Sequence, residues 1–167
     1  AALVDHDRIS LSDLQRYRPH VPQMSLFGKA HFLLAALGVA GSEAIRVEVT
    51  SLILAHANQS GGKFVFSEVI DDSYERMLSS TLRTNAAVLS ALTAYGRADA
   101  GRQSVGDIPF KLVRYITRSR GNRDHWENTQ ENMFCMNALI DYSRRYEREA
   151  PDMTLRAMFD AEEMGRT

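Results

Sequence analysis

The chain has 167 residues, with 20 lysines and arginines against 21 acids, and it contains a single cysteine. This length suffices for one ordinary domain with a core, and the balanced charge excludes a generally basic nucleic-acid-binding protein and an acidic disordered tail. One cysteine excludes an internal disulfide framework and a cysteine-rich metal site. The longest nearly uncharged run, residues 30–42, is far shorter than the ~20 residues that cross a bilayer, so we expect a soluble chain without membrane contact.

Three segments share one helical pattern. Residues 85–96 and 132–143 align with an asparagine, an Ala-Leu pair and a tyrosine at matching positions, and residues 30–41 share the Ala-Leu pair. Self-similarity at such a spacing predicts stacked helical hairpins, because one hairpin cannot bury its apolar face alone.

The segments between the repeats are expected to supply the second helix of each hairpin. One is residues 42–58, with Ser42 as a candidate N-cap, and the other is residues 107–122, with a single apolar stripe. Residues 132–146 differ from these, because they carry two stripes on nearly opposite sides and are therefore predicted to be buried on both. The first stripe is Met133, Met136 and Ile140, and the second is Cys135, Leu139, Tyr142 and Tyr146. Alternating two-sided and one-sided helices predict an inner layer wrapped by an outer one, as in an α/α toroid or solenoid.

Two stretches break the helical pattern. Residues 61–77 alternate around Phe64 and Phe66 after a glycine pair, which predicts a short strand or extended loop before Asp71. Residues 153–160 alternate again and predict a strand, for which the chain offers no obvious partner. We therefore expect a mainly all-α chain, with a partial α/α toroid over residues 1–149. The first strand of a following β-rich domain is expected over residues 150–167, where the chain would be truncated.

Cys135 is the first candidate for chemistry. A nucleophilic cysteine needs a helix N-terminus, a base or a metal to lower the pKa of its thiol. Cys135 is expected about two turns inside its helix between Phe134 and Met136, so the sequence favours a core residue. The five histidines show no metal-ligand spacing, and a packed pair of His31 and His56 is the simpler expectation.

Other polar clusters have a structural interpretation beside the functional one. Asn128 or Thr129 is expected to cap a helix, with Glu131 in its first turn, and a catalytic role for Glu127 and Glu131 has no support. A second set is the loop acids Glu68, Asp71 and Asp72, which either bind a cation or cap the next helix. A third is a basic cluster without an interleaved aromatic platform, for which a solvated face is favoured over a phosphate site. It comprises Lys111, Arg114, Arg118, Arg120 and Arg123.

Three stretches resemble the thioester-containing helical domain of bacterial alpha-2-macroglobulins. They are "SLFGKAHFLLAAL", "DDSYERMLSSTLRTNAAVLSALTAY" and "WENTQENMFCMNALIDYSRRYE". Within them, residues 25–30, 83–92 and 126–139 carry the family-like patterns, and "APDMT" at residues 150–154 resembles the passage into the next β domain.

The resemblance implies a broad-range protease trap of the bacterial periplasm or cell envelope, with the anchoring of the parent left open. In that family a protease cuts a bait region, and an internal Cys-to-Gln thioester becomes exposed and acylates the attacker. The Cys-x-Glu-Gln motif is absent here, since Met136, Asn137 and Ala138 follow Cys135. The stretch around Asp71, Asp72 and Tyr74 is the candidate for a loop that borders the thioester face.

On this interpretation the chain is not an enzyme and has no catalytic, cofactor or metal site of its own. Its partners would be proteases, through the full-length protein, and neighbouring β domains of the same chain, with self-association through the open toroid edge. Two alternatives come from other classes. One is an α/α-toroid enzyme of the terpenoid-cyclase or glycan-processing type, which needs clustered acids or a metal site, and the other is a helical-repeat interaction scaffold.

Overall fold

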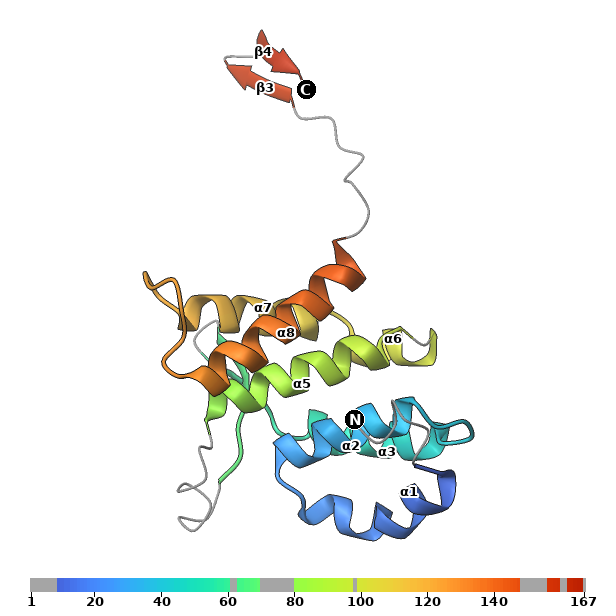
Figure 1. Cartoon of the computed structure of the whole chain (residues 1–167). Helices are drawn as coiled ribbons and strands as arrows, with labels where there is room; N and C mark the ends of the chain where they lie inside the picture. Colours follow the sequence, from blue (N-terminus) through green and yellow to red (C-terminus); the bar gives the residue numbers. More distant parts are fainter. Residues whose placement is uncertain are drawn as a thin grey trace.

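The computed structural model describes residues 9–60, 63–69, 80–97, 99–147, 156–159 and 162–166, and the side chains of Asp99, Ala100, Arg102 and the last two segments are left aside. The elements are α1 (Leu11–Tyr17), the 3-10 helix η1 (Arg18–Gln23), α2 (Leu26–Leu37), α3 (Glu43–Leu54), β1 (Ala57–Ser60), β2 (Lys63–Phe66), α5 (Thr81–Tyr95), α6 (Asp99–Val105), α7 (Ile108–Ser119), α8 (Thr129–Tyr146), β3 (Arg156–Phe159) and β4 (Glu162–Arg166). The chain is thus mainly helical with a short β segment at the C-terminus, as the sequence predicted (Figure 1).

Polar side chains at the helix starts explain where most of these helices begin. Ser25, Ser80 and Asn128 each accept a hydrogen bond from the backbone N–H three residues ahead, at 3.2, 3.2 and 2.9 Å. These bonds satisfy donors that have no partner within the helix. Ser42 occupies the expected N-cap position of α3 but makes no capping bond. Its hydroxyl instead donates to the carbonyls of Ala36 and Val39, which ties the end of α2 to the start of α3.

Helix α5 lies at the centre of the helical body (Figure 1). It packs against α2 on one side and against α8 on the other, so the three repeat helices lie in a row. The intervening helices lie beside this row, with α3 against α2 and α7 against α5. Because α5 is enclosed, ten of its fifteen residues are buried.

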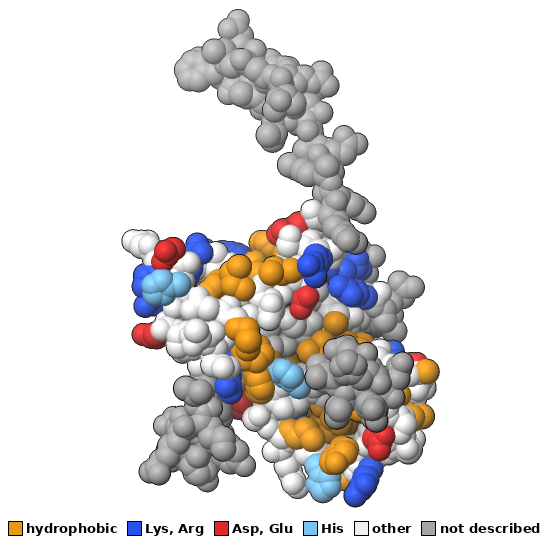
Figure 2. Space-filling model, in the orientation of Figure 1, with side chains coloured by type: hydrophobic (Ala, Val, Ile, Leu, Met, Phe, Trp, Pro, Cys, Tyr) orange, Lys and Arg blue, Asp and Glu red, His pale blue; other side chains and the backbone are white. Residues whose placement is uncertain are grey.

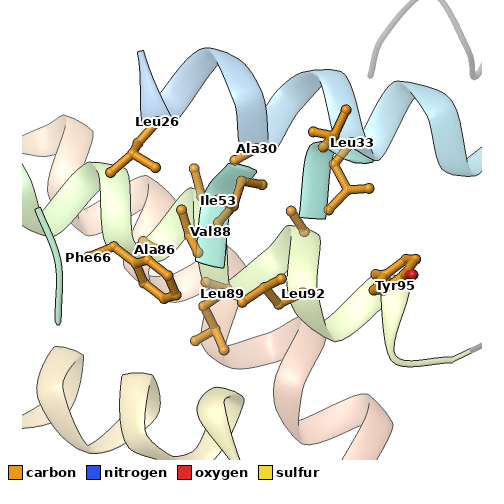
Figure 3. Close-up of a cluster of buried hydrophobic side chains, with 14 of the residues drawn as sticks. Leu26, Ala30, Leu33, Ile53, Phe66, Ala86, Val88, Leu89, Leu92 and Tyr95 are labelled. Carbon is orange, nitrogen blue, oxygen red and sulfur yellow. The ribbon is translucent and has the colours of Figure 1, made fainter. Parts of the chain in front are cut away.

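The main core fills the space between α2 and α5. Leu26 and Leu33 extend from α2 toward α5, which contributes Leu92, while Ile53 enters from α3 and Phe66 from β2 (Figure 3). All five of these side chains are fully buried. At about 25 cal/mol per Å² of apolar surface, fully burying such a side chain contributes roughly 1.5–3 kcal/mol, so this contact is a major source of stability in the helical body.

The prediction that residues 132–146 are buried on both sides is wrong. On α8 the stripe of Met133, Met136 and Ile140 is 48%, 50% and 40% exposed, whereas Cys135 and Ala138 on the other side are fully buried against α5. Apolar spacing indicates a second face that could be buried, but among the described residues α5 and α7 pack against α8 without covering the stripe of Met133, Met136 and Ile140. The one-sided character predicted for α7 is confirmed, since Leu112 and Ile116 are buried while Arg114 and Arg118 are exposed.

The first β-hairpin replaces the end of a predicted helix. Helix α3 ends at Leu54, not near residue 58, because residues 57–60 form β1 and pair antiparallel with β2, which lies in the stretch predicted as a short strand or extended loop. Main-chain pairing between Ala57 and Phe66 competes successfully with helical continuation there.

The second hairpin answers the question of a partner for the C-terminal strand. The strand predicted over residues 153–160 is present as β3, and its partner, which is not obvious in the sequence, is the short strand β4, paired antiparallel with it. Residues 162–166, "EEMGR", contain no β-branched or aromatic side chain, so their sequence carries no strand signal. The assignment of residues 150–167 to a following domain stays a prediction.

Within the described residues, no helix combines the length and the apolar character needed to cross a membrane.

Candidate functional site

Asn85 of α5 fixes the first hairpin against the helical body. This fully buried amide accepts a hydrogen bond from the N–H of Phe66 at 2.8 Å and donates to the carbonyl of Phe66 at 2.9 Å and to that of Thr81 at 2.8 Å. The amide thus pairs with both polar groups of the last strand residue, which would otherwise be buried without partners. The hairpin is therefore held in one position beside α7, which β2 also contacts.

A pocket of about 280 Å³ lies between this hairpin and α7. It is lined by Gln59, Lys63, Phe64, Lys111, Arg114, Tyr115, Arg118 and Ser119, and we call it the basic pocket. Lys111, Arg114 and Arg118 are three and four residues apart on α7, so they project from one face of the helix. Lys63 and Phe64 are brought to them by the hairpin.

Cations surround an aromatic surface in the basic pocket. The ammonium of Lys111 lies 5.5 Å from the ring centroid of Phe64 and 3.0 Å from the carboxylate of Asp107, one turn earlier on α7. Burial raises the pKa of the Tyr115 hydroxyl, so this side chain stays neutral at physiological pH. No acidic residue is among the described residues that line the basic pocket. The arrangement is suited to holding an anion that carries an apolar part.

The basic pocket changes the interpretation of the basic cluster. The sequence favoured a solvated face because no aromatic platform accompanied the arginines, but Phe64 and Tyr115 supply one. Lys63 and Phe64 were missed because they lie far from α7 in sequence and no local pattern signals the contact. Arg120 and Arg123 belong elsewhere, since Arg120 lies 5.8 Å from the ring of Trp126 and Arg123 lines a second pocket.

The second pocket, of about 390 Å³, adjoins the first through Tyr115 and Ser119, which line both. One side of this second pocket is lined by Trp126, Glu127 and Glu131, which lie between α7 and α8 or at the start of α8. The Trp126 indole N–H donates to the carbonyl of Ile116 at 3.1 Å, and its backbone N–H donates to the Asn132 amide oxygen at 3.1 Å. Trp126 therefore joins the end of α7 to the start of α8.

Glu131 and Glu127, the weak candidates for catalysis, belong to the same junction. The Glu131 carboxylate accepts hydrogen bonds from the Ser80 hydroxyl at 2.5 Å and from the Glu127 N–H at 3.2 Å. It also lies in the first turn of α8, where the helix dipole favours a negative charge. The predicted cap is confirmed as Asn128. These contacts give Glu131 a structural role at the start of the helix.

Cys135 is a core residue, as predicted. Its side chain is fully buried, and burial, with a smaller contribution from the charge of Glu131, raises the pKa of the thiol to about 12. A thiol with this pKa is almost entirely protonated at neutral pH and is a poor nucleophile.

The remaining polar candidates have local partners or lie outside the described residues. His31 and His56 each contact a backbone carbonyl, of Phe27 at 3.0 Å and of Ser67 at 3.3 Å, rather than pairing with each other. Glu68 accepts a hydrogen bond from the first N–H of α2 at 2.8 Å. Asp71, Asp72 and Tyr74, the predicted loop at the thioester face, fall in residues 70–79, outside the part of the chain that the structure describes. Within the described part, no group of three His, Cys, Asp or Glu side chains is placed to hold a metal ion.

Comparison with protein-family models, with curated proteins and with solved structures finds no match to this chain.

Proposed function

We propose that the chain is a structural part of the thioester-type helical domain of a bacterial alpha-2-macroglobulin-like protease trap. The observation that carries this proposal is the row of repeat helices α2, α5 and α8, with α3 and α7 beside it. An α/α toroid is built from such a row of inner helices with outer helices beside them, and here α2 and α5 each have an outer helix. In this role the chain forms part of the wall of the domain, and the reactive bond belongs to another part of the parent protein.

Cys135 supports a non-reactive role for this part of the wall. Its thiol is buried in the contact of α8 with α5, and its pKa is raised. A thioester cysteine must have its sulfur joined to a glutamine side chain, and the residues after Cys135 provide neither the glutamine nor the spacing of the family motif.

The exposed stripe of Met133, Met136 and Ile140 on α8 supports the idea that a further element packs beside α8 in the parent protein. Hydrophobic side chains gather on the part of the surface where Figure 1 places α8 (Figure 2). Half-exposed methionines in a line along one helix are typical of a surface that another apolar element covers. We expect the next helix of the row, or a neighbouring β domain of the parent, to cover this stripe. In the isolated chain, a second copy would take that place.

The stripe is tested by measuring the mass of the isolated chain by sedimentation over a range of concentrations. We expect concentration-dependent self-association of the wild-type chain, and its loss in Met136→Glu, because a carboxylate in an apolar contact is costly to desolvate. Gln15→Glu, on the exposed side of α1, is the matched control and should behave as the wild type. A wild-type chain that stays monomeric at all concentrations would contradict the expectation that this stripe is a contact surface.

The protease trap is tested on the full-length gene product that contains the chain. After incubation with trypsin, we expect cleavage of a short chromogenic peptide to continue while digestion of casein is blocked, because a trapped protease remains accessible only to small substrates. Methylamine should release one free thiol if the parent carries the thioester. Unhindered digestion of casein would reject the trap and leave the scaffold interpretation, while an unchanged thiol count would reject only the covalent version. Fractionation should place the full-length protein in the periplasm or cell envelope.

A further inference from the structure

The basic pocket combines two surfaces that a single ligand can use at once. One is apolar and consists of the Phe64 and Tyr115 rings, and the other is the set of cations on α7 with Lys63. Aromatic rings offer a flat surface for stacking, and guanidinium groups match the oxygens of phosphate in a two-pronged geometry. We propose that the basic pocket binds a small organic phosphate, with its ring against Phe64 and Tyr115 and its phosphate among Lys111, Arg114 and Arg118. This proposal is independent of the protease trap.

The apolar surface is held in place before any ligand binds. Phe64 packs edge-on against Phe66, with ring centroids 5.5 Å apart and an interplanar angle of 83°. Phe66 is fully buried and its backbone is held by the Asn85 amide. Tyr115 is half-buried on α7, opposite the hairpin. A ligand ring would therefore not need to order these residues, and that reduces the entropic cost of binding.

The charges around the pocket favour a dianion. Three cations lie within two turns of α7, and among the described residues Asp107 makes the one ion pair to them, with Lys111. Asp107 is 68% exposed, so water weakens this pair and a phosphate can compete with it for the ammonium. A phosphate monoester carries about two negative charges at neutral pH and reduces the mutual repulsion of these cations more than a carboxylate does.

The size of the basic pocket limits the ligand. At about 280 Å³ it lies just below the usual range for small-molecule sites, which leaves room for one ring and one phosphate. A nucleic-acid strand would need a longer groove with several stacking platforms.

The test is a calorimetric titration of the chain with phenyl phosphate, compared with inorganic phosphate and with phenol. We expect phenyl phosphate to bind at least about tenfold more tightly than either part, because only the joined molecule uses both surfaces. Arg118→Gln should weaken phenyl phosphate binding about tenfold, which is typical for the loss of one charge-assisted hydrogen bond. Arg144→Gln, at an exposed position on α8 outside the lining, removes the same charge and should leave binding unchanged.

Two further variants test the aromatic surface and the cations of the basic pocket separately. Phe64→Leu should weaken phenyl phosphate severalfold and leave inorganic phosphate unaffected, with circular dichroism to confirm that the hairpin variant is folded. Asp107→Asn should strengthen phosphate binding about two- to threefold, since it frees Lys111, and asparagine is an equally good residue at the start of a helix. Binding of phenyl phosphate no tighter than inorganic phosphate, equal losses in Arg118→Gln and Arg144→Gln, or no heat of binding at 10 mM ligand would each overturn the proposal. None of these results bears on the protease assay.

Discussion

Raising the pH should destabilise the protein through Cys135, because its thiol must ionise inside the core. The pKa of the thiol is about 12 in the folded protein against 9.0 for an ordinary cysteine. Because the folded-state value is the higher one, the folded protein holds this proton more tightly than the unfolded chain. The associated stability is fully present below pH 9 and is lost as the pH rises from 9 toward 12. With these two values, the thiol accounts for a loss of roughly 1 kcal/mol between pH 8 and pH 10.

The variant Cys135→Ala isolates this contribution. Burial also raises the pKa of Tyr115 and Tyr142, which changes stability in the same direction, but both tyrosines remain in the variant. The variant should start about 1–2 kcal/mol less stable because it leaves a small cavity, and it should lose correspondingly less stability as the pH rises.

Urea unfolding at pH 8, 9 and 10, followed by the fluorescence of the buried Trp126, gives the free energy of unfolding of both proteins. We expect the difference between them to shrink by roughly 1 kcal/mol from pH 8 to pH 10. A difference that stays constant with pH would refute the reasoning. A thiol reagent gives an independent measure, since the thiolate fraction at pH 8 is about a thousandfold lower for a pKa of about 12 than for 9.0. Labelling should be slow in the native protein and fast after unfolding, and rapid native labelling would contradict the core position of the thiol.

Two other substitutions test the junctions around the pockets. Asn85→Ala should lower the free energy of unfolding by about 3 kcal/mol, because it leaves the buried N–H and C=O of Phe66 without partners, whereas Asn137→Ala on the exposed side of α8 should cost less than ~0.5 kcal/mol in the same urea experiment. Glu131→Gln should cost about 1 kcal/mol at the start of α8 and should lower the pKa of Cys135, since the negative charge that opposes ionisation is removed. A faster native labelling rate at pH 9 checks the second effect, and an unchanged rate would argue against the influence of Glu131.

Local sequence features predicted the helices well. Capping residues such as Asn128 and apolar spacing such as that of Leu112 and Ile116 act within a few residues, so they can be recognised without knowledge of the fold. The same holds for Cys135, whose apolar neighbours and distance from the helix start indicated a buried thiol. Strand β4 lacked any such feature, because its pairing with β3 depends on the main chain rather than on side-chain type.

Features that depend on contacts between distant segments were predicted less well. The two apolar stripes of α8 are equivalent in sequence, and only the position of α5 decides that the side with Cys135 is buried and the side with Met136 is exposed. Helical periodicity identifies an apolar face but does not reveal how many neighbours are present to cover it.

The sequence by itself determined the mainly helical fold class, the repeat helices and the buried position of the cysteine, because composition, capping and periodicity act over short distances. Only the tertiary structure decided that the arginines of α7 border an aromatic surface. That surface depends on the hydrogen bonds of Asn85, which hold Phe66 and with it the neighbouring Phe64 beside α7. Such a contact joins residues far apart in the chain, and a pattern read along one segment contains no information about it.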